Sequence, residues 1–89
     1  MRAVITVIGK DMVGILAKVS TECARHNINV IEVTQSVLQD LFAMIMMVDI
    51  SDSDVPFTAF AETITAIGAE MGLSIHAMHE DIFNAMHTI

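Results

Sequence analysis

The sequence predicts an α+β domain in which two helices cover one face of a four-stranded antiparallel sheet. Three observations predict it. Short β-branched segments alternate with segments of helical periodicity in the order β-α-β-β-α-β. The two-residue connection Gln39-Asp40 joins the two middle strands as a hairpin. The chain has 89 residues, which is enough for one small domain.

The first half of the domain is predicted to be a strand, a helix and the hairpin. Residues 3–8 form a β-branched strand that ends at Gly9. Residues 14–26 follow helical periodicity, and the hairpin strands are residues 30–38 and 41–50. The apolar stripe of the helix is expected to consist of Ile15, Leu16, Val19 and Cys23. Its expected water-facing residues are Lys18, Glu22 and Arg25. In the first hairpin strand, the residues expected to share one face are Ile31, Val33 and Val37.

The second half is predicted to be a helix, a strand and a short final helix. Ser51 to Asp54 supply candidate N-caps, and Pro56 follows in the first turn. Gly72 suits the position just after the helix, and residues 73–79 form the last strand. Helical spacing is seen for Phe57, Phe60, Ile64, Ile67 and Met71. In the tail, the residues expected on one side are Ile82, Phe83 and Met86.

This order of elements, with right-handed crossovers and a central hairpin, corresponds to the ferredoxin-like βαββαβ sandwich. The chain therefore divides into a ferredoxin-like domain at residues 1–80 and a helical tail at residues 81–89. The third strand contains the run "LFAMIMMV", residues 41–48, in which every side chain is apolar. Because side chains alternate between faces, both faces of the sheet must be covered. The second face is then covered by the tail, by a second subunit, or by both.

The composition narrows the class of partner. The net charge is −7 with four Lys and Arg in all, so nucleic acid is excluded as an expected partner. The most apolar segment is interrupted by Asp49, Asp52 and Asp54, so no membrane span is expected. The first residues do not have the layout of a signal peptide, and a cytoplasmic protein is expected. The single cysteine, Cys23, is expected to be a core thiol rather than a nucleophile.

Neither a metal site nor a catalytic site is predicted. His76 and His79 are three apart on a strand and so point to opposite faces. His79, Glu80 and His87 converge on one ion only if the tail folds back, and hydrogen-bonded histidines are the expected alternative. The residue pattern contains no nucleophile–base constellation. We therefore expect no enzyme activity and no cofactor.

The junction "VIGKDMVGILAKVS", residues 7–20, is the candidate functional segment. It has the spacing Gly9-x-Asp11-x-x-Gly14 between a strand and a helix. A helix N-terminus presents unpaired N–H groups, and Gly14 in the first turn would let a ligand or another backbone approach. Asp11 can cap the helix. The junction is therefore either a well-made turn without a ligand or a small anion site.

The segment "VIGKDMVGILAKVSTECARHNINVIEVTQ" resembles the start of an ACT domain. The matching residues are Asp11, Gly14, Ile15, Leu16, Asn27, Ile28 and Asn29. Val13 departs from the pattern, because many relatives have Pro there. The resemblance covers residues 1–80, and the tail "HEDIFNAMHTI" is similar to small stand-alone ACT proteins related to the glycine-cleavage repressor group.

The resemblance implies a regulatory module that binds an amino acid or another small ligand, at an interface between two copies. The residues it implies for the ligand site are Asp11, Met12, Val13, Gly14 and Asn29. An ionised Asp11 only accepts hydrogen bonds, which favours an ammonium group over a carboxylate. A homodimer is the simplest oligomer. The alternative is an interaction protein whose ACT-like sheet builds an assembly without a ligand.

Overall fold

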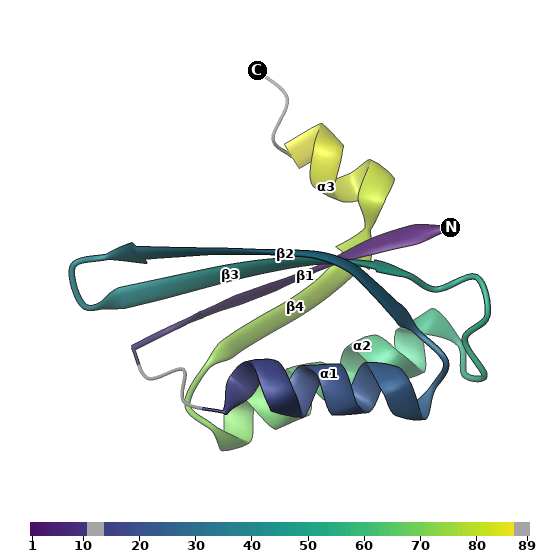
Figure 1. Cartoon of the computed structure of the whole chain (residues 1–89), viewed down its shortest axis with the longest axis horizontal. Coiled ribbons are helices and arrows are strands. Elements are labelled where there is room, and N and C mark those ends of the chain that lie inside the picture. Colours follow the sequence, from purple (N-terminus) through teal and green to yellow (C-terminus); the bar gives the residue numbers. More distant parts are fainter. Residues whose placement is uncertain (11–13, 87–89) are drawn as a thin grey trace.

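The computed structural model confirms the predicted α+β sandwich (Figure 1). It describes residues 1–10 and 14–86, with the side chain of Leu38 outside that description. The strands of the sheet lie in the order β2-β3-β1-β4, and each neighbouring pair is antiparallel. Helices α1 and α2 cover one face, and α3 rises from the other, here named the back face. The elements are β1 (Arg2–Gly9), α1 (Ile15–Arg25), β2 (Asn29–Leu38), β3 (Leu41–Asp49), α2 (Phe57–Glu70), β4 (Ser74–His79) and α3 (Glu80–Met86).

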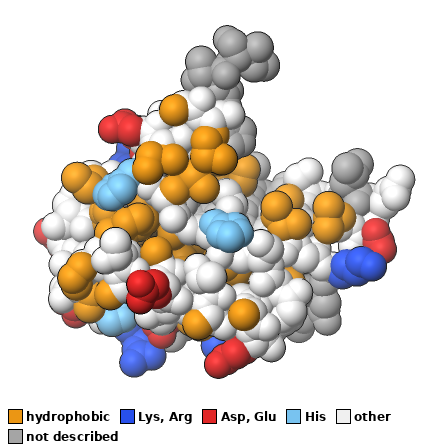
Figure 2. All heavy atoms as spheres, turned by 180° about the vertical axis from the view of Figure 1, so that it is seen from behind, with side chains coloured by type: hydrophobic (Ala, Val, Ile, Leu, Met, Phe, Trp, Pro, Cys, Tyr) orange, Lys and Arg blue, Asp and Glu red, His pale blue; other side chains and the backbone are white. Residues whose placement is uncertain are grey.

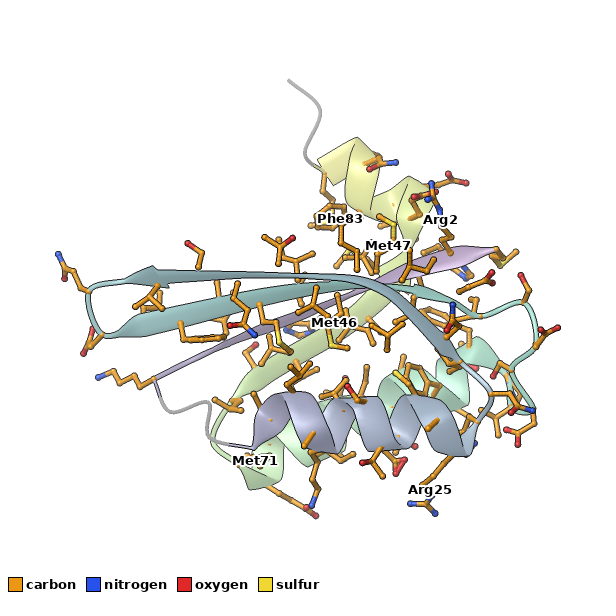
Figure 3. The ribbon with its side chains drawn as sticks, in the orientation of Figure 1. Arg2, Arg25, Met46, Met47, Met71 and Phe83 are labelled. Carbon is orange, nitrogen blue, oxygen red and sulfur yellow. The ribbon has the colours of Figure 1, made fainter. Side chains whose placement is uncertain are left out.

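The core lies between the sheet and the two long helices. Alternate side chains of each strand point into it, and Figure 3 shows Met46 on the helix side of β3 and Met47 on the opposite side. The side chain of Phe60, from α2, lies at the centre of this core and is 1% exposed. The largest fully buried core side chains are Phe60, Ile5, Ile15, Met44, Met46, Ile64 and Ile75.

Both long helices end in the same C-terminal motif. After α1, Asn27 has a left-handed φ of 58°, and the Ile28 amide donates to the Cys23 carbonyl at 2.9 Å. After α2, Gly72 has a φ of 73°, and the Leu73 amide donates to the carbonyl of Gly68 at 2.8 Å. This is the Schellman arrangement, in which a left-handed residue lets the next amide reach back to an unpaired carbonyl. The role predicted for Gly72 is confirmed.

The buried stripe of α1 is rotated relative to the prediction. Glu22, predicted to face water, is 9% exposed, whereas Leu16, predicted to be buried, is 38% exposed. Helical periodicity places both residues near the boundary of the apolar stripe, so a small rotation of the helix exchanges them. The helix also begins at Ile15 rather than Gly14.

Two other local predictions were wrong. The residue preceding α2 in the N-cap position is Pro56, and no side chain in the described part of the chain caps the helix. Ser53, one of the predicted caps, instead donates its hydroxyl to the Val55 carbonyl at 2.9 Å and so shapes the loop. In β2, the register shifts between Val30 and Glu32, so Ile31 lies in a bulge and leaves the expected face.

The back face is covered at one end. Val4 is fully buried but does not belong to the core under α1 and α2. Its strand partners are Met47 and Met78, both half-buried, and Figure 3 shows Phe83 of α3 pointing down toward this region. Phe83 thus packs inward, whereas Ile82 and Met86, predicted to share its side, are 53% and 67% exposed. At the other end of the face, the exposed large apolar residues are Ile8, Leu41 and Ile45.

Replacing Phe60 by Ala should cost about 3–5 kcal/mol of folding free energy, because a large side chain in the middle of the core leaves a cavity. Urea unfolding measures the loss. Glu62→Ala on the exposed side of the same helix is the control and should change stability by less than about 0.5 kcal/mol. Equal losses for the two variants would contradict the placement of α2.

Candidate functional site

The candidate site begins at Gly14, the residue before α1. Gly14 has a left-handed φ of 77°, and its carbonyl accepts the first helical hydrogen bond, from the Lys18 amide at 3.0 Å. Within residues 1–10 and 14–86, no side chain caps this end, and the first turn contains no acidic residue. The amides of the first turn are therefore left without helical acceptors. The other loop residues of the predicted site, Asp11, Met12 and Val13, lie outside the described residues.

The conformation of Gly14 differs from the one predicted. We expected Gly14 inside the first turn, where a Cβ would obstruct an approaching group. It lies before the helix, and a Cβ added there would meet no atom within 4 Å. Within one copy of the chain, the glycine is required by its positive φ, which other L-residues adopt at a cost. Among the described residues, Gly14 is exposed.

An open groove of about 460 Å³ runs along α1 from Gly14. It carries charges of both signs, since Lys18 and Arg25 line it together with Glu22. The Arg25 Nη1 donates to Glu22 Oε1 at 2.9 Å. The full lining is Gly14, Ala17, Lys18, Thr21, Glu22 and Arg25.

Glu22 and His26 join the end of α1 to the loop before α2. His26 Nδ1 lies 2.9 Å from Asp54 Oδ1, and the Asp54 amide donates to the His26 carbonyl at 3.2 Å. His26 Nε2 lies 4.0 Å from Glu22 Oε2. Among the described side chains, that oxygen is buried without a hydrogen-bond partner. This cluster was not predicted from the sequence, although the i,i+4 spacing of Glu22 and His26 is a signal for it.

Asn29, the other predicted ligand residue, lies at the far end of α1. It is the first residue of β2, is exposed, and pairs with Asp49 of β3. Gly14 precedes the 11 residues of α1 and Asn29 follows them, and a helix of that length spans about 16 Å. A single copy of the chain therefore does not bring Gly14 and Asn29 together (Figure 1).

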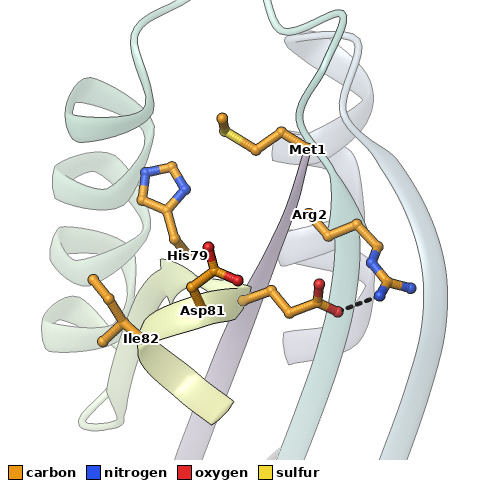
Figure 4. Close-up of a pocket in the computed structure, with 6 residues that line it drawn as sticks. Met1, Arg2, His79, Asp81 and Ile82 are labelled. Carbon is orange, nitrogen blue, oxygen red and sulfur yellow. Dashed lines mark ion pairs between the residues drawn. The ribbon is translucent and has the colours of Figure 1, made fainter. Parts of the chain in front are cut away.

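A second hollow, of about 550 Å³, lies where β4 passes into α3 (Figure 4). Its walls carry His79 and Asp81, and an ion pair between Arg2 and Glu80 crosses one side. The His79 ring packs against Phe57 with 4.5 Å between centroids, while His76 contacts the Ser74 hydroxyl at 3.0 Å. Within residues 1–10 and 14–86, no three potential ligand side chains are grouped for a metal ion. His87 of the alternative metal set lies outside the described residues.

The thiol of Cys23 is buried in the core, as predicted. Burial raises its pKa to about 11 from an ordinary 9.0, and the negative charge of Glu22 adds to the shift. A thiol with so high a pKa carries almost no thiolate at neutral pH, and the thiolate is the nucleophilic form. This environment gives a structural role to the cysteine.

Comparison with known proteins gives a consistent result. The sequence profile of a family described as "ACT domain" matches residues 2–78. A UPF0237 protein of Listeria innocua is 47% identical over 89 residues, covering 100% of both chains. A UPF0237 protein of Methanopyrus kandleri is 46% identical over 88 residues, covering 99% of this chain and 98% of the relative.

Two solved structures extend the comparison. An ACT domain protein from Streptococcus pneumoniae superposes with a TM-score of 0.79 at 34% identity, covering 100% of this chain and 97% of that one. A structure assigned to a glycine cleavage system transcriptional repressor superposes with a TM-score of 0.67 at 23% identity. It covers 86% of this chain and 44% of the repressor, and at that identity the likeness is one of fold. Among the described residues, no helix is both long and apolar enough to cross a membrane.

Gly14→Ala should destabilise the fold by about 1–2 kcal/mol, because it forces an L-residue into the left-handed region without any new contact. Gly14→Asn is the matched variant and should lose less, since Asn tolerates this conformation better than Ala. Thermal melting of the two proteins measures the difference. If the alanine variant melted at or above the parent temperature, a left-handed Gly14 would be contradicted.

Stability should fall as the pH rises from about 9 to about 11. In this window the unfolded chain releases the Cys23 proton while the folded chain keeps it, so the raised pKa favours unfolding. Cys23→Ala removes this titration, so the stability advantage of the parent over the variant should shrink across the window. Urea unfolding at each pH measures both proteins. A constant difference between them would show that the thiol titrates alike in both states.

Proposed function

Because the chain belongs to the ACT domain family, we propose that it is a regulatory module that binds an amino acid and acts as a homodimer. ACT domains are ligand-binding regulatory modules, and amino acids are their typical ligands. The observation that carries the proposal is the exposed start of α1 at Gly14, where no side chain among the described residues caps the first-turn amides. The ligand would lie there.

The chemistry of this end fits the two charged groups of an amino acid. The carboxylate would accept hydrogen bonds from the first-turn amides of α1, where the helix dipole favours negative charge. The ammonium group would bind Asp11, because an ionised carboxylate accepts and does not donate. Met12 and Val13 would form the loop side of the site and contact the ligand side chain.

We propose that each site is shared between two copies, because Gly14 and Asn29 lie at opposite ends of α1. β2 is an edge strand, and α1 contacts it. A two-fold axis near the middle of α1 would place the two α1 helices side by side in opposite directions. Each Gly14 would then lie near Asn29 of the other copy. The same pairing would cover Leu16 and Ile31, which are 38% and 46% exposed.

We also propose that the protein is cytoplasmic, has no catalytic activity of its own and does not bind nucleic acid. The net charge of −7 opposes phosphate binding. The buried Cys23 and the partnered His26 are held in structural contacts, which supports regulation over catalysis. A change of ligand occupancy would be passed on through the shared interface.

A thermal-shift screen against the twenty amino acids tests ligand binding. A ligand present at one hundred times its Kd should stabilise the protein by about 2.7 kcal/mol. Asp11→Ala and Asn29→Ala should each abolish the shift, whereas Asp52→Ala, which removes the same charge from an exposed loop position, should retain it. If all three variants responded like the parent, the site would lie elsewhere.

Mixing the two site variants tests the sharing. In a heterodimer of Asp11→Ala with Asn29→Ala, one site draws Asp11 from one copy and Asn29 from the other and is intact. The second site lacks both residues. Isothermal titration of an equimolar mixture should therefore recover about one quarter of the parent sites. No recovery would show that both residues act within one chain.

The second candidate is an interaction protein whose sheet builds an assembly without a ligand. The exposed apolar residues of the back face favour it, because such surface is typical of contact sites. A screen in which no amino acid raises the melting temperature, combined with a stable oligomer in solution, would support this candidate over the first.

A further inference from the structure

The chain has a cavity that the proposed amino-acid site does not use. It lies at the end of the sandwich where β1 begins, between the loop before α2 and the end of β4, and its volume is about 200 Å³. We propose that this inner cavity binds a small primary amine that carries an apolar ring. The residues that line it are Met1, Ile28, Ile50, Ser53, Val55, Phe57, Phe60 and His79.

The lining of the inner cavity fits one apolar ring. Phe60 and Ile28 are buried, whereas Phe57 and Val55 are half-buried, so the cavity leads from the core toward solvent. An apolar cavity of about 150 Å³ is large enough to bind benzene. A volume of about 200 Å³ therefore holds a six-membered ring with a short linker. The rings of Phe57 and Phe60 favour an aromatic group, because aromatic pairs gain more than their buried area alone supplies.

His79 lies at the mouth of the inner cavity. It lines this cavity and also the hollow of about 550 Å³ where β4 passes into α3, here named the outer hollow. Figure 4 shows its ring and the Met1 side chain reaching toward the same space. The ring packs against Phe57, and within the described ranges its nitrogens have no hydrogen-bond partner. A neutral imidazole has one nitrogen that accepts a hydrogen bond, so His79 suits a donor group held at the mouth.

The charges of the outer hollow favour a cationic head on the ligand. Both cations there are already paired, since Arg2 binds Glu80 and the terminal ammonium of Met1 lies 3.7 Å from Asp49 Oδ1. Asp81 is exposed and forms no ion pair with any residue that the structure describes. Figure 2 shows histidine, acidic and basic side chains among hydrophobic ones beside α3. An ammonium head therefore meets one unpaired carboxylate, whereas a carboxylate head is repelled by it.

This inference does not rest on the proposed amino-acid site. The inner cavity lies where β1 begins, and the junction to Gly14 lies where β1 ends. The eight residues of β1 separate the two places by about 26 Å within one copy. Ile28 of the inner cavity directly precedes Asn29 in the chain, so Asp11→Ala is the better variant for removing the amino-acid site alone.

Titration with benzylamine, followed through the backbone amide resonances in heteronuclear NMR, tests the site. Millimolar benzylamine should leave Gly14 unchanged and should shift the amides of Val55, Phe57, His79 and Asp81. Benzoate, which has the same ring and the opposite charge, should cause no shift at the same concentration. Benzyl alcohol keeps the ring and a hydrogen-bond donor without the charge. It should bind about two- to fivefold more weakly than benzylamine, which is the contribution of an exposed ion pair.

Three variants separate the head, the ring and the other site. Asp81→Asn should lower the affinity for benzylamine to that for benzyl alcohol, and Asp40→Asn, which removes an exposed carboxylate at the hairpin turn, should not. Val55→Phe fills the inner cavity and should abolish binding of both probes, with far-UV circular dichroism as the check on folding. Asp11→Ala should bind benzylamine as the parent does, so failure of the amino-acid site is distinguished from failure of this one.

The inference would be overturned by any of three results. The first is a parent protein in which benzylamine does not shift the amides lining the inner cavity. The second is an equal affinity for benzylamine and benzoate. The third is an Asp81→Asn variant with the parent affinity, and because Asp81 is exposed on α3 this variant tests the proposal even if Val55→Phe does not fold.

Discussion

The central position of β1 is the constraint on which the rest of the structure depends. β1 pairs with β3 on one side and β4 on the other, and its first half, residues 3–5, is buried from both faces. Ile5 packs under the long helices, and Val4 is fully buried on the opposite face. Because side chains alternate strictly along a strand, the register of β1 fixes which residues of both neighbours enter the core. It also fixes where the chain leaves the sheet at Gly9 to begin the α1 loop.

Much of the fold could be predicted from local patterns. The periods of 2 and 3.6 residues identified the elements, and Gly72 identified the end of the second long helix. The errors have tertiary causes. Glu22 is buried because α1 rotates to pack on the sheet, and Ile31 bulges because β2 changes register against β3. Periodicity within one segment contains no information on either adjustment.

The site was less predictable than the fold. The sequence pattern identified Gly14 as an unusual position. Spacing alone could not tell whether the glycine is needed for a positive φ or for the close approach of another group, and the structure shows a positive φ. The family resemblance implied that Asn29 belongs to the same ligand site as Gly14. Such a resemblance groups residues by their role and does not give their positions within one copy of the chain. The length of α1 separates the two residues, and that separation follows from the rise per residue once the helix is known. The cluster of His26 with Asp54 joins elements 28 residues apart and is visible only in three dimensions.

The bulge at Ile31 has a consequence for how the edge of the sheet behaves in a crowded solution. An edge strand exposes a row of backbone donors and acceptors that can recruit further strands without limit. In β2 the register shift interrupts this row, so the regular stretch runs from Glu32 to Leu38. A partner strand longer than that stretch loses its alignment at the bulge. The bulge thus shortens the regular edge that β2 presents to another strand.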